Sequence, residues 1–305
     1  VDDVVVSGGG GCAVGGRGRA SGLGVVVILL LALGWRRRGI LLALLCVRVA
    51  AAEGPTFDIG TFHPVSGTSG SLVTVERPQV GDEGWSFGFV VDRAYNPLRA
   101  KSETTGAENV AVAERTAVAI MAGFTAGKRV ELGVSMPFIS QASAGIDGVM
   151  LLPAAPGQML GDLSFRAKGH VVEIGSLALG LGADLTAPLG DERKYAGANG
   201  FTAGGRLLIG MDAGRLRLAA NVGYLVRQNT VTFEEKGQEE NWQGDVTTYA
   251  MGGAFRVARG LDAIAEMYGA AGLPQANATE PVLEALGALR FSTRAGISLV
   301  VGVGK

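Results

Sequence analysis

The chain has 305 residues, with 27 basic against 28 acidic side chains and a formal net charge of −1. This balance excludes attraction to nucleic acid or to an anionic surface as the basis of function. Cys12 and Cys46 are the two cysteines, so a disulfide framework or a zinc site built on paired CxxC motifs is excluded as well.

The N-terminal 52 residues carry targeting patterns. Residues 1–38 combine a glycine run around Cys12, an apolar stretch from Leu23 to Trp35 and the arginines 36–38, an order that resembles a myxobacterial C-terminal sorting tail. Residues 36–52 have the basic start, apolar centre and small-residue end of a signal peptide, with cleavage expected before Glu53. We predict that the sorting tail of one reading frame is joined here to the signal peptide of the next.

The alternative for this stretch is a hydrophobic, helical membrane anchor between residues 23 and 47. The three central arginines make a single span costly, at ~2.5–3.5 kcal/mol each near a bilayer centre. Residues 53–84, which come next, are predicted to be a periplasmic lead-in to the folded domain.

From residue 85 onward, strand-like segments are joined by long and short connections in strict alternation. The segments lie near 85–95, 114–125, 130–139, 160–170, 176–187, 200–211, 216–227, 246–256, 261–270, 282–290 and 295–303. Tight turns such as Gly127-Lys128-Arg129 follow the even-numbered segments, and long polar loops follow the odd-numbered ones. Short turns on one rim and long loops on the other are typical of outer-membrane barrels. We therefore predict that residues 85–305 form an all-β, up-and-down antiparallel transmembrane barrel of about 12 strands.

The strand faces agree with a membrane barrel, in which apolar side chains meet lipid and smaller or polar ones meet the lumen. In segment 216–227, Leu218 and Val222 share one face, whereas Arg217 and Asn221 share the other. A slip of one residue would turn the polar face toward lipid, at ~2–4 kcal/mol for an arginine at the midplane. Many of the 49 glycines fall within such alternating runs, which predicts close packing or curvature along the wall.

The same alternation selects charged and polar candidates for the lumen. They are Arg166, Lys168, Asp184, Arg206, Arg217, Asn221, Arg227, Arg256, Glu266, Glu284 and Arg290. Their mixed signs predict ion pairs across the interior rather than a wide selective pore. Aromatic residues at strand ends, among them Tyr224 and Tyr268, are candidates for interfacial girdles.

Two structural questions stay open at this point. A soluble β-sandwich also has alternating strands, but its Greek-key crossovers do not suit regular long and short loops. Single-chain bacterial barrels have even strand numbers, so the eleven segments predict a twelfth, closing strand beyond Lys305. The alternative is that residues 53–84 supply the extra strand or sit inside the barrel.

Several stretches resemble the N-terminal barrel of large OmpA-family outer-membrane proteins of myxobacteria. They are Tyr95-Asn96-Pro97-Leu98, Arg129–Gln141, Leu160–Lys168 and Leu185–Gly210. The resemblance covers most of residues 84–305. It implies a structural anchor of the cell envelope, with peptidoglycan as a partner through a C-terminal domain outside this chain.

The sequence pattern assigns no catalytic, metal or cofactor residue. An enzyme would have to join His170 to Ser164 or Ser176, as in outer-membrane hydrolases with a Ser/His pair, and nothing in the spacing requires it. Paired carboxylates in the long loops, such as Asp191-Glu192, lack the spacing of a calcium-binding loop.

The sequence therefore predicts an OmpA-like anchor, not an enzyme, embedded in the lipid of the bacterial outer membrane and independent of nucleic acid and cofactors. The alternative function is a narrow outer-membrane channel or transporter for small or lipidic solutes.

Overall fold

The computed structural model describes residues 4–5, 11–17, 60, 62–66, 71–101, 108–143, 155–198, 200–229, 231–235, 238–272 and 282–305. Apart from the 3-10 helix η1 (Glu192–Lys194), the regular elements in these residues are strands. The N-terminal half contains β1 (Val4–Val5), β2 (Gly11–Arg17), β3 (Gly84–Lys101), β4 (Glu108–Ala126), β5 (Val130–Ala142), β6 (Gly157–Leu160), β7 (Leu163–Ile174) and β8 (Leu177–Ala187). The C-terminal half contains β9 (Thr202–Ala213), β10 (Leu216–Arg227), β11 (Val231–Glu235), β12 (Gln238–Gln243), β13 (Val246–Ala258), β14 (Leu261–Gly272), β15 (Val282–Ser292) and β16 (Ile297–Gly304).

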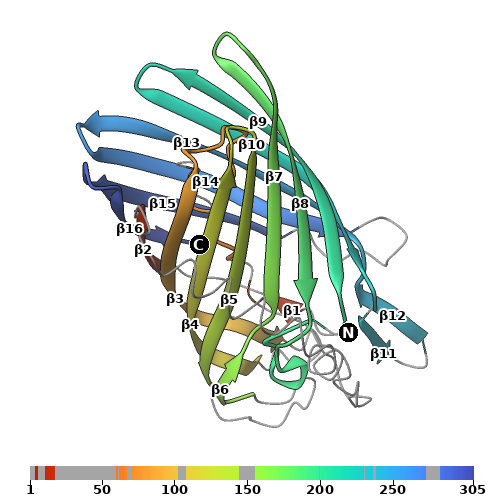
Figure 1. Ribbon diagram of the computed structural model, residues 1–305. Coiled ribbons are helices and arrows are strands. Elements are labelled where there is room, and N and C mark those ends of the chain that lie inside the picture. The colour runs from red at the N-terminus through yellow and green to blue at the C-terminus, as the bar shows by residue number, and fades with distance from the viewer. Residues whose placement is uncertain are drawn as a thin grey trace, which may run out of the picture.

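Twelve of these strands form a closed ring (Figure 1). Its order is β2, β3, β4, β5, β7, β8, β9, β10, β13, β14, β15 and β16, with β16 pairing back to β2. Within this sheet β1 pairs with the far end of β3 and β6 pairs with β5, whereas β11 and β12 form a separate hairpin. All pairings are antiparallel, and closure leaves the sheet without a free edge. The predicted all-β barrel of about 12 strands is confirmed.

Strand β2 supplies the twelfth strand. It belongs to the segment that resembles a sorting tail, and its register places Cys12 opposite Val301 of β16 and Val91 of β3. The sequence predicts the closing strand beyond Lys305 instead. An edge strand exposes a row of unpaired backbone groups, and β2 pairs with the rows of β16 and β3 together. The predicted signal peptide at 36–52 and the predicted hydrophobic helix lie outside the described residues.

The predicted strand rhythm agrees with the ring except near the first long loop. Strands β3 and β4 continue past the expected strand ends, so that residues 98–101 pair with residues 108–112. The pairing shifts between Tyr95 and Leu98, where Asn96 has a φ of 50° and Pro97 follows. Asn tolerates this left-handed conformation, and Pro lacks an N–H, so the pair resembles a loop in sequence while forming a bulge in structure.

A further irregularity concerns the predicted strand 160–170, which corresponds to β7, whereas its first residue is the last of a separate short strand, β6. Strand β5 pairs with β7 along Val130–Ser135 and with β6 along Phe138–Gln141. Between the two stretches, Pro137 has no N–H to offer a neighbouring strand. Gly161 packs closely against it, since a Cβ at this glycine would lie 2.5 Å from the Cγ of Pro137.

The outer surface of the ring is apolar. Leu181 of β8, Val222 of β10 and Met251 of β13 are each more than half exposed, and many other large apolar side chains are exposed on the same face. A continuous apolar exterior on a closed barrel is a lipid-facing band, which places the protein in the bacterial outer membrane. No helix within the described ranges is long and apolar enough to cross a membrane.

One predicted girdle residue faces inward. Tyr268 of β14 donates a hydrogen bond from its hydroxyl to Glu284 of β15 at 2.7 Å and packs against buried side chains of the interior. It shares its strand face with the buried Asp262 and Glu266, so the period-two alternation already separates it from the lipid side. The girdle assignment of Tyr268 is therefore wrong.

The lead-in to the barrel lies in its lumen. We call residues 60, 62–66 and 71–83 the plug. Ser66 of the plug approaches Gly123 of β4 and Gly133 of β5, whereas Glu76 bonds to Asn221 of β10. Because these strands lie far apart around the ring, the plug must sit between them. Of the alternatives for residues 53–84, the structure shows the interior position for the residues that make up the plug.

Candidate functional site in the barrel lumen

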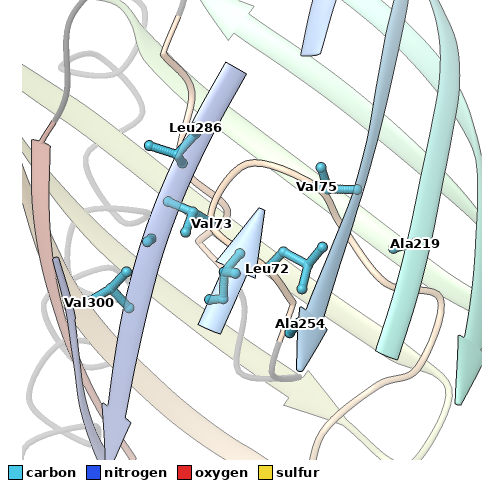
Figure 2. Close-up of a cluster of buried hydrophobic side chains, with 9 residues drawn as sticks. Leu72, Val73, Val75, Ala219, Ala254, Leu286 and Val300 are labelled. Atoms are coloured by element: carbon cyan, nitrogen blue, oxygen red, sulfur yellow. The ribbon is translucent and has the colours of Figure 1, made fainter. Parts of the chain in front are cut away.

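The apolar part of the plug packs against small and branched side chains of the wall (Figure 2). Leu72, Val73 and Val75 lie on a loop between strands, and all are buried. The wall members of this cluster come from five consecutive strands of the ring: Ala219, Ala254, Ile264, Leu286, Ala288 and Val300. Fully burying a valine or leucine contributes roughly 1.5–3 kcal/mol, so these contacts favour the inserted position of the plug.

Glycines on the lumen face leave room for the plug. A Cβ at Gly210 of β9 would lie 2.6 Å from the Cδ of Pro78, and a Cβ at Gly133 would overlap the Oγ of Ser66. A side chain at either position therefore requires that the plug residue it meets be moved or replaced. The glycine content predicts close packing along the wall, and at these positions the packing partner is the plug.

Wall side chains also satisfy the backbone of the plug. A buried segment outside a sheet has no ladder partners for its N–H and C=O groups. At Glu76, the side chain of Asn221 of β10 supplies both partners. Its amide group donates to the Glu76 carbonyl at 2.7 Å and accepts from the Glu76 N–H at 2.8 Å. The pair fixes the backbone at this residue.

Two charged wall residues bind the backbone groups of plug residues 71–74. Glu266 of β14 accepts hydrogen bonds from the N–H groups of Val73 and Thr74 and, at 2.7 Å, from the Thr74 hydroxyl. Arg290 of β15 donates to the carbonyls of residues 71 and 72 at 2.6 and 2.7 Å. The carboxylate therefore binds plug donors, and the guanidinium binds plug acceptors.

The side chain of Glu76 belongs to a row of buried charges. Its carboxylate oxygens lie 2.8 Å from Arg206 of β9 and 3.8 Å from Lys168 of β7. Arg206 also binds Asp184 of β8 at 2.6 and 3.0 Å, and Lys168 lies 3.4 Å from Glu131 of β5. The side chains of Glu76, Lys168 and Glu131 are at most 4% exposed. Charges at this depth are stable only when they are paired.

Arg166 of β7 continues the row toward the start of the plug. Its Nε lies 3.2 Å from Asp184, and its guanidinium donates to the carbonyl of Pro64 at 3.2 Å. The row thus alternates in sign across β5, β7, β8 and β9 and includes one plug residue.

A second set of ion pairs lies toward the short-turn rim. Arg77 of the plug binds Asp212 at the end of β9 at 2.5 Å. Arg217 of β10 pairs with Asp262 of β14, which also lies 3.9 Å from Arg256.

The predicted lumen residues therefore divide by their partners. Those that contact the plug are Arg166, Lys168, Arg206, Asn221, Glu266 and Arg290. Three others, Asp184, Arg217 and Glu284, bind wall residues. Arg227 donates to the carbonyl of Gly244 beyond the end of its strand, and Arg256 is exposed next to a short turn.

Sequence reasoning overlooked four charged residues of this region. Glu131 lies between the exposed Val130 and Leu132 on β5, and Asp212 occupies the same alternate positions of β9 as Thr202 and Arg206, so strand periodicity was the signal that could have found both. Glu76 and Arg77 lie in an irregular segment without periodicity, and no local signal marks them.

The hypothetical Ser/His pair is not assembled. His170 and Ser164 lie six residues apart on β7, which is roughly 20 Å at ~3.3 Å per residue. In the part of the chain that the structure describes, no three His, Cys, Asp or Glu side chains are grouped to hold a metal ion.

The closed ring, its lipid-facing exterior and the inserted segment define an outer-membrane β-barrel with a plugged lumen. No family model and no curated protein matches the chain. Among solved structures, the toluene transporter TodX of Pseudomonas putida is similar at 11% identity with a TM-score of 0.40, covering 74% of this chain and 80% of its own. A FadL homologue of Pseudomonas aeruginosa is similar at 10% identity with a TM-score of 0.32, covering 99% and 86%. The resemblance to the OmpA family stays a prediction.

Proposed function

We propose that this protein is a narrow outer-membrane channel or transporter for small or lipidic solutes, closed while its plug is inserted and open when the plug moves. The observation that supports this function is the way the plug is held. The hydrogen bonds that the structure describes between the plug and the wall are made by side chains, as at Asn221, Glu266 and Arg290. The ladder of the wall is formed by pairs of strands around the ring, so movement of the plug leaves that ladder intact.

A structural anchor does not require a separate plug segment in its lumen. Small barrels fill their interior with wall side chains, but this wall presents glycines where the plug comes close. The predicted structural anchor is the competing function, and it differs from the proposal in one measurable respect: an anchor does not need the plug to move.

A reversible lock on the plug tests the proposal. The Cβ of Ser66 lies 3.2 Å from the position of a Cβ at Gly133, close to the ~3.8 Å that separates these atoms in disulfides. The double variant Ser66→Cys/Gly133→Cys, with Cys12 and Cys46 replaced by serine, should join the plug to β5 under oxidising conditions. The single variant Ser66→Cys in the same background is the matched control.

Flux is then measured in liposome swelling with arabinose and in planar bilayers with potassium chloride. We expect the reduced double variant to show swelling and channel openings, and the oxidised form to fall to the level of protein-free membranes. The single variant should not respond to oxidation. Absence of flux in both redox states would overturn the channel and favour the anchor.

A further inference from the structure

Wall residues bind both the backbone and the side chain of Glu76. Its backbone is held by Asn221 through two hydrogen bonds, and its carboxylate reaches Arg206 and Lys168. The other acidic residues of the plug, Asp82 and Glu83, are exposed. Glu76 is therefore the acidic side chain that the described plug inserts among wall cations.

The wall around this carboxylate has an excess of one positive charge. Lys168, Arg206 and Arg166 are basic, and Glu131 and Asp184 are acidic. Glu76 supplies the missing negative charge. When the plug moves away, these five wall residues keep an excess of one positive charge, and Lys168, which Glu76 and Gln79 of the plug contact, becomes accessible to solutes in the lumen. A positive excess in a narrow lumen attracts anions, so another anion is favoured in the place of Glu76.

The chemistry of the neighbours selects the kind of anion. The two Glu76 oxygens are divided between Arg206 and Lys168, the arrangement that a single carboxylate can reproduce. Glu131 and Asp184 lie directly behind these cations and would repel a second negative charge, as on inorganic phosphate. A singly charged carboxylate fits this balance.

We infer that Lys168 and Arg206 form a carboxylate-binding site of the lumen, that Glu76 is its built-in occupant, and that carboxylate-bearing solutes compete with Glu76 and release the plug. The release step rests on the proposed function, whereas the binding site stands independently of it.

The site is tested by removing its occupant. The change Glu76→Ala deletes two carbons and two oxygens, the same heavy atoms that make up acetate. In the full chain, purified in detergent, sodium acetate should raise the thermal midpoint of the Glu76→Ala barrel, whereas acetamide and sodium chloride at equal concentrations should not. The wild-type barrel should need at least tenfold more acetate for the same shift. The variant Glu83→Ala, changed at an exposed plug position, should behave as wild type.

Specificity is tested with a second change and a second anion. Adding Arg206→Gln to Glu76→Ala should abolish the acetate response. An equal response to inorganic phosphate, or an acetate response that survives Arg206→Gln, would overturn the assignment.

Release of the plug is tested on the unmodified protein, so that a folding defect of a variant cannot affect the result. Butyrate should increase hydrogen exchange at the amides of residues 73–76, and the uncharged butyramide should not. Unchanged exchange with butyrate would overturn the competition between butyrate and Glu76.

If acetate stabilises Glu76→Ala while the reduced disulfide variant shows no flux, the proposed channel is wrong and the carboxylate-binding site is supported. If that variant conducts while no barrel responds to acetate, the site fails and the channel stands.

Discussion

At the scale of single residues, side chains of the wall bind backbone N–H and C=O groups of the plug. Asn221 binds both backbone groups of Glu76, a contact between residues 145 positions apart in the chain. A side-chain amide has one donor side and one acceptor side, so it can replace a neighbouring strand for one residue of the plug. Neither group has water available, because both residues are buried.

This predicts a selective effect of Asn221→Leu on the plug. Two buried backbone groups would lose their partners, at roughly 1–3 kcal/mol each, so exchange of the plug amides should rise by about 30-fold or more. Hydrogen exchange followed by mass spectrometry measures this change, while the wall strands should keep their protection. The change Val222→Leu, one position away on the lipid face, is the control. Unaltered exchange of the plug would show that Asn221 does not hold it.

At the scale of the strand, the barrel depends on alternation between a lipid face and a lumen face. On β10, the exposed residues Leu218, Val222 and Val226 alternate with the buried Ala219 and Asn221. The strands beside β10 match it residue for residue without a register shift, so the faces stay aligned across the sheet. A change of polarity on one face therefore has a cost that depends on its depth in the bilayer.

We expect Val222→Arg to destabilise the folded barrel by ~2–4 kcal/mol, because Val222 lies in the middle of β10 on the lipid face. The matched change Ile297→Arg, at the exposed first residue of β16 beside a short turn, should cost only ~0–1 kcal/mol. Urea unfolding in lipid bilayers, followed by the gel mobility of the folded form, compares the two. Equal effects would argue against a lipid-facing band centred on Val222.

At the scale of the whole molecule, closure of the ring depends on a short strand from the opposite end of the sequence. Strand β2 pairs with β16 and with β3, so the first and last described parts of the chain become neighbours in the wall (Figure 1). A barrel closed in this way can enclose the plug on all sides, and it leaves neither β3 nor β16 as an edge.

The register of β2 predicts a disulfide. With Cys46 replaced by serine, a cysteine at position 301 should form a bond with Cys12 on oxidation, because the two positions are direct partners in the ladder. The covalent link between residues so far apart in sequence should change the mobility of the denatured protein in a non-reducing gel. The same variant carrying Cys12→Ser is the control. If no Cys12-dependent shift appears, even with the alternative partner Val91→Cys, β2 does not occupy this place.

The amino-acid order alone predicts the strand segments, the long and short loops, the lipid face and the charged face. These features are local, since each depends on a period of two residues or on turn residues next to the strand. The lumen residues Lys168, Arg206, Asn221, Glu266 and Arg290 follow from that period alone, but their partners do not.

The segment that fills the barrel and the strand that closes it became evident only in the folded chain. The plug has no periodicity, and its contacts join residues as distant as Leu72 and Arg290, 218 positions apart. Its place depends on matching its backbone groups and charges to side chains of many strands at once. Likewise, the pairing of β2 depends on the two edges that β3 and β16 present after the other strands have assembled. Such matches exist only in three dimensions, so no local pattern records them.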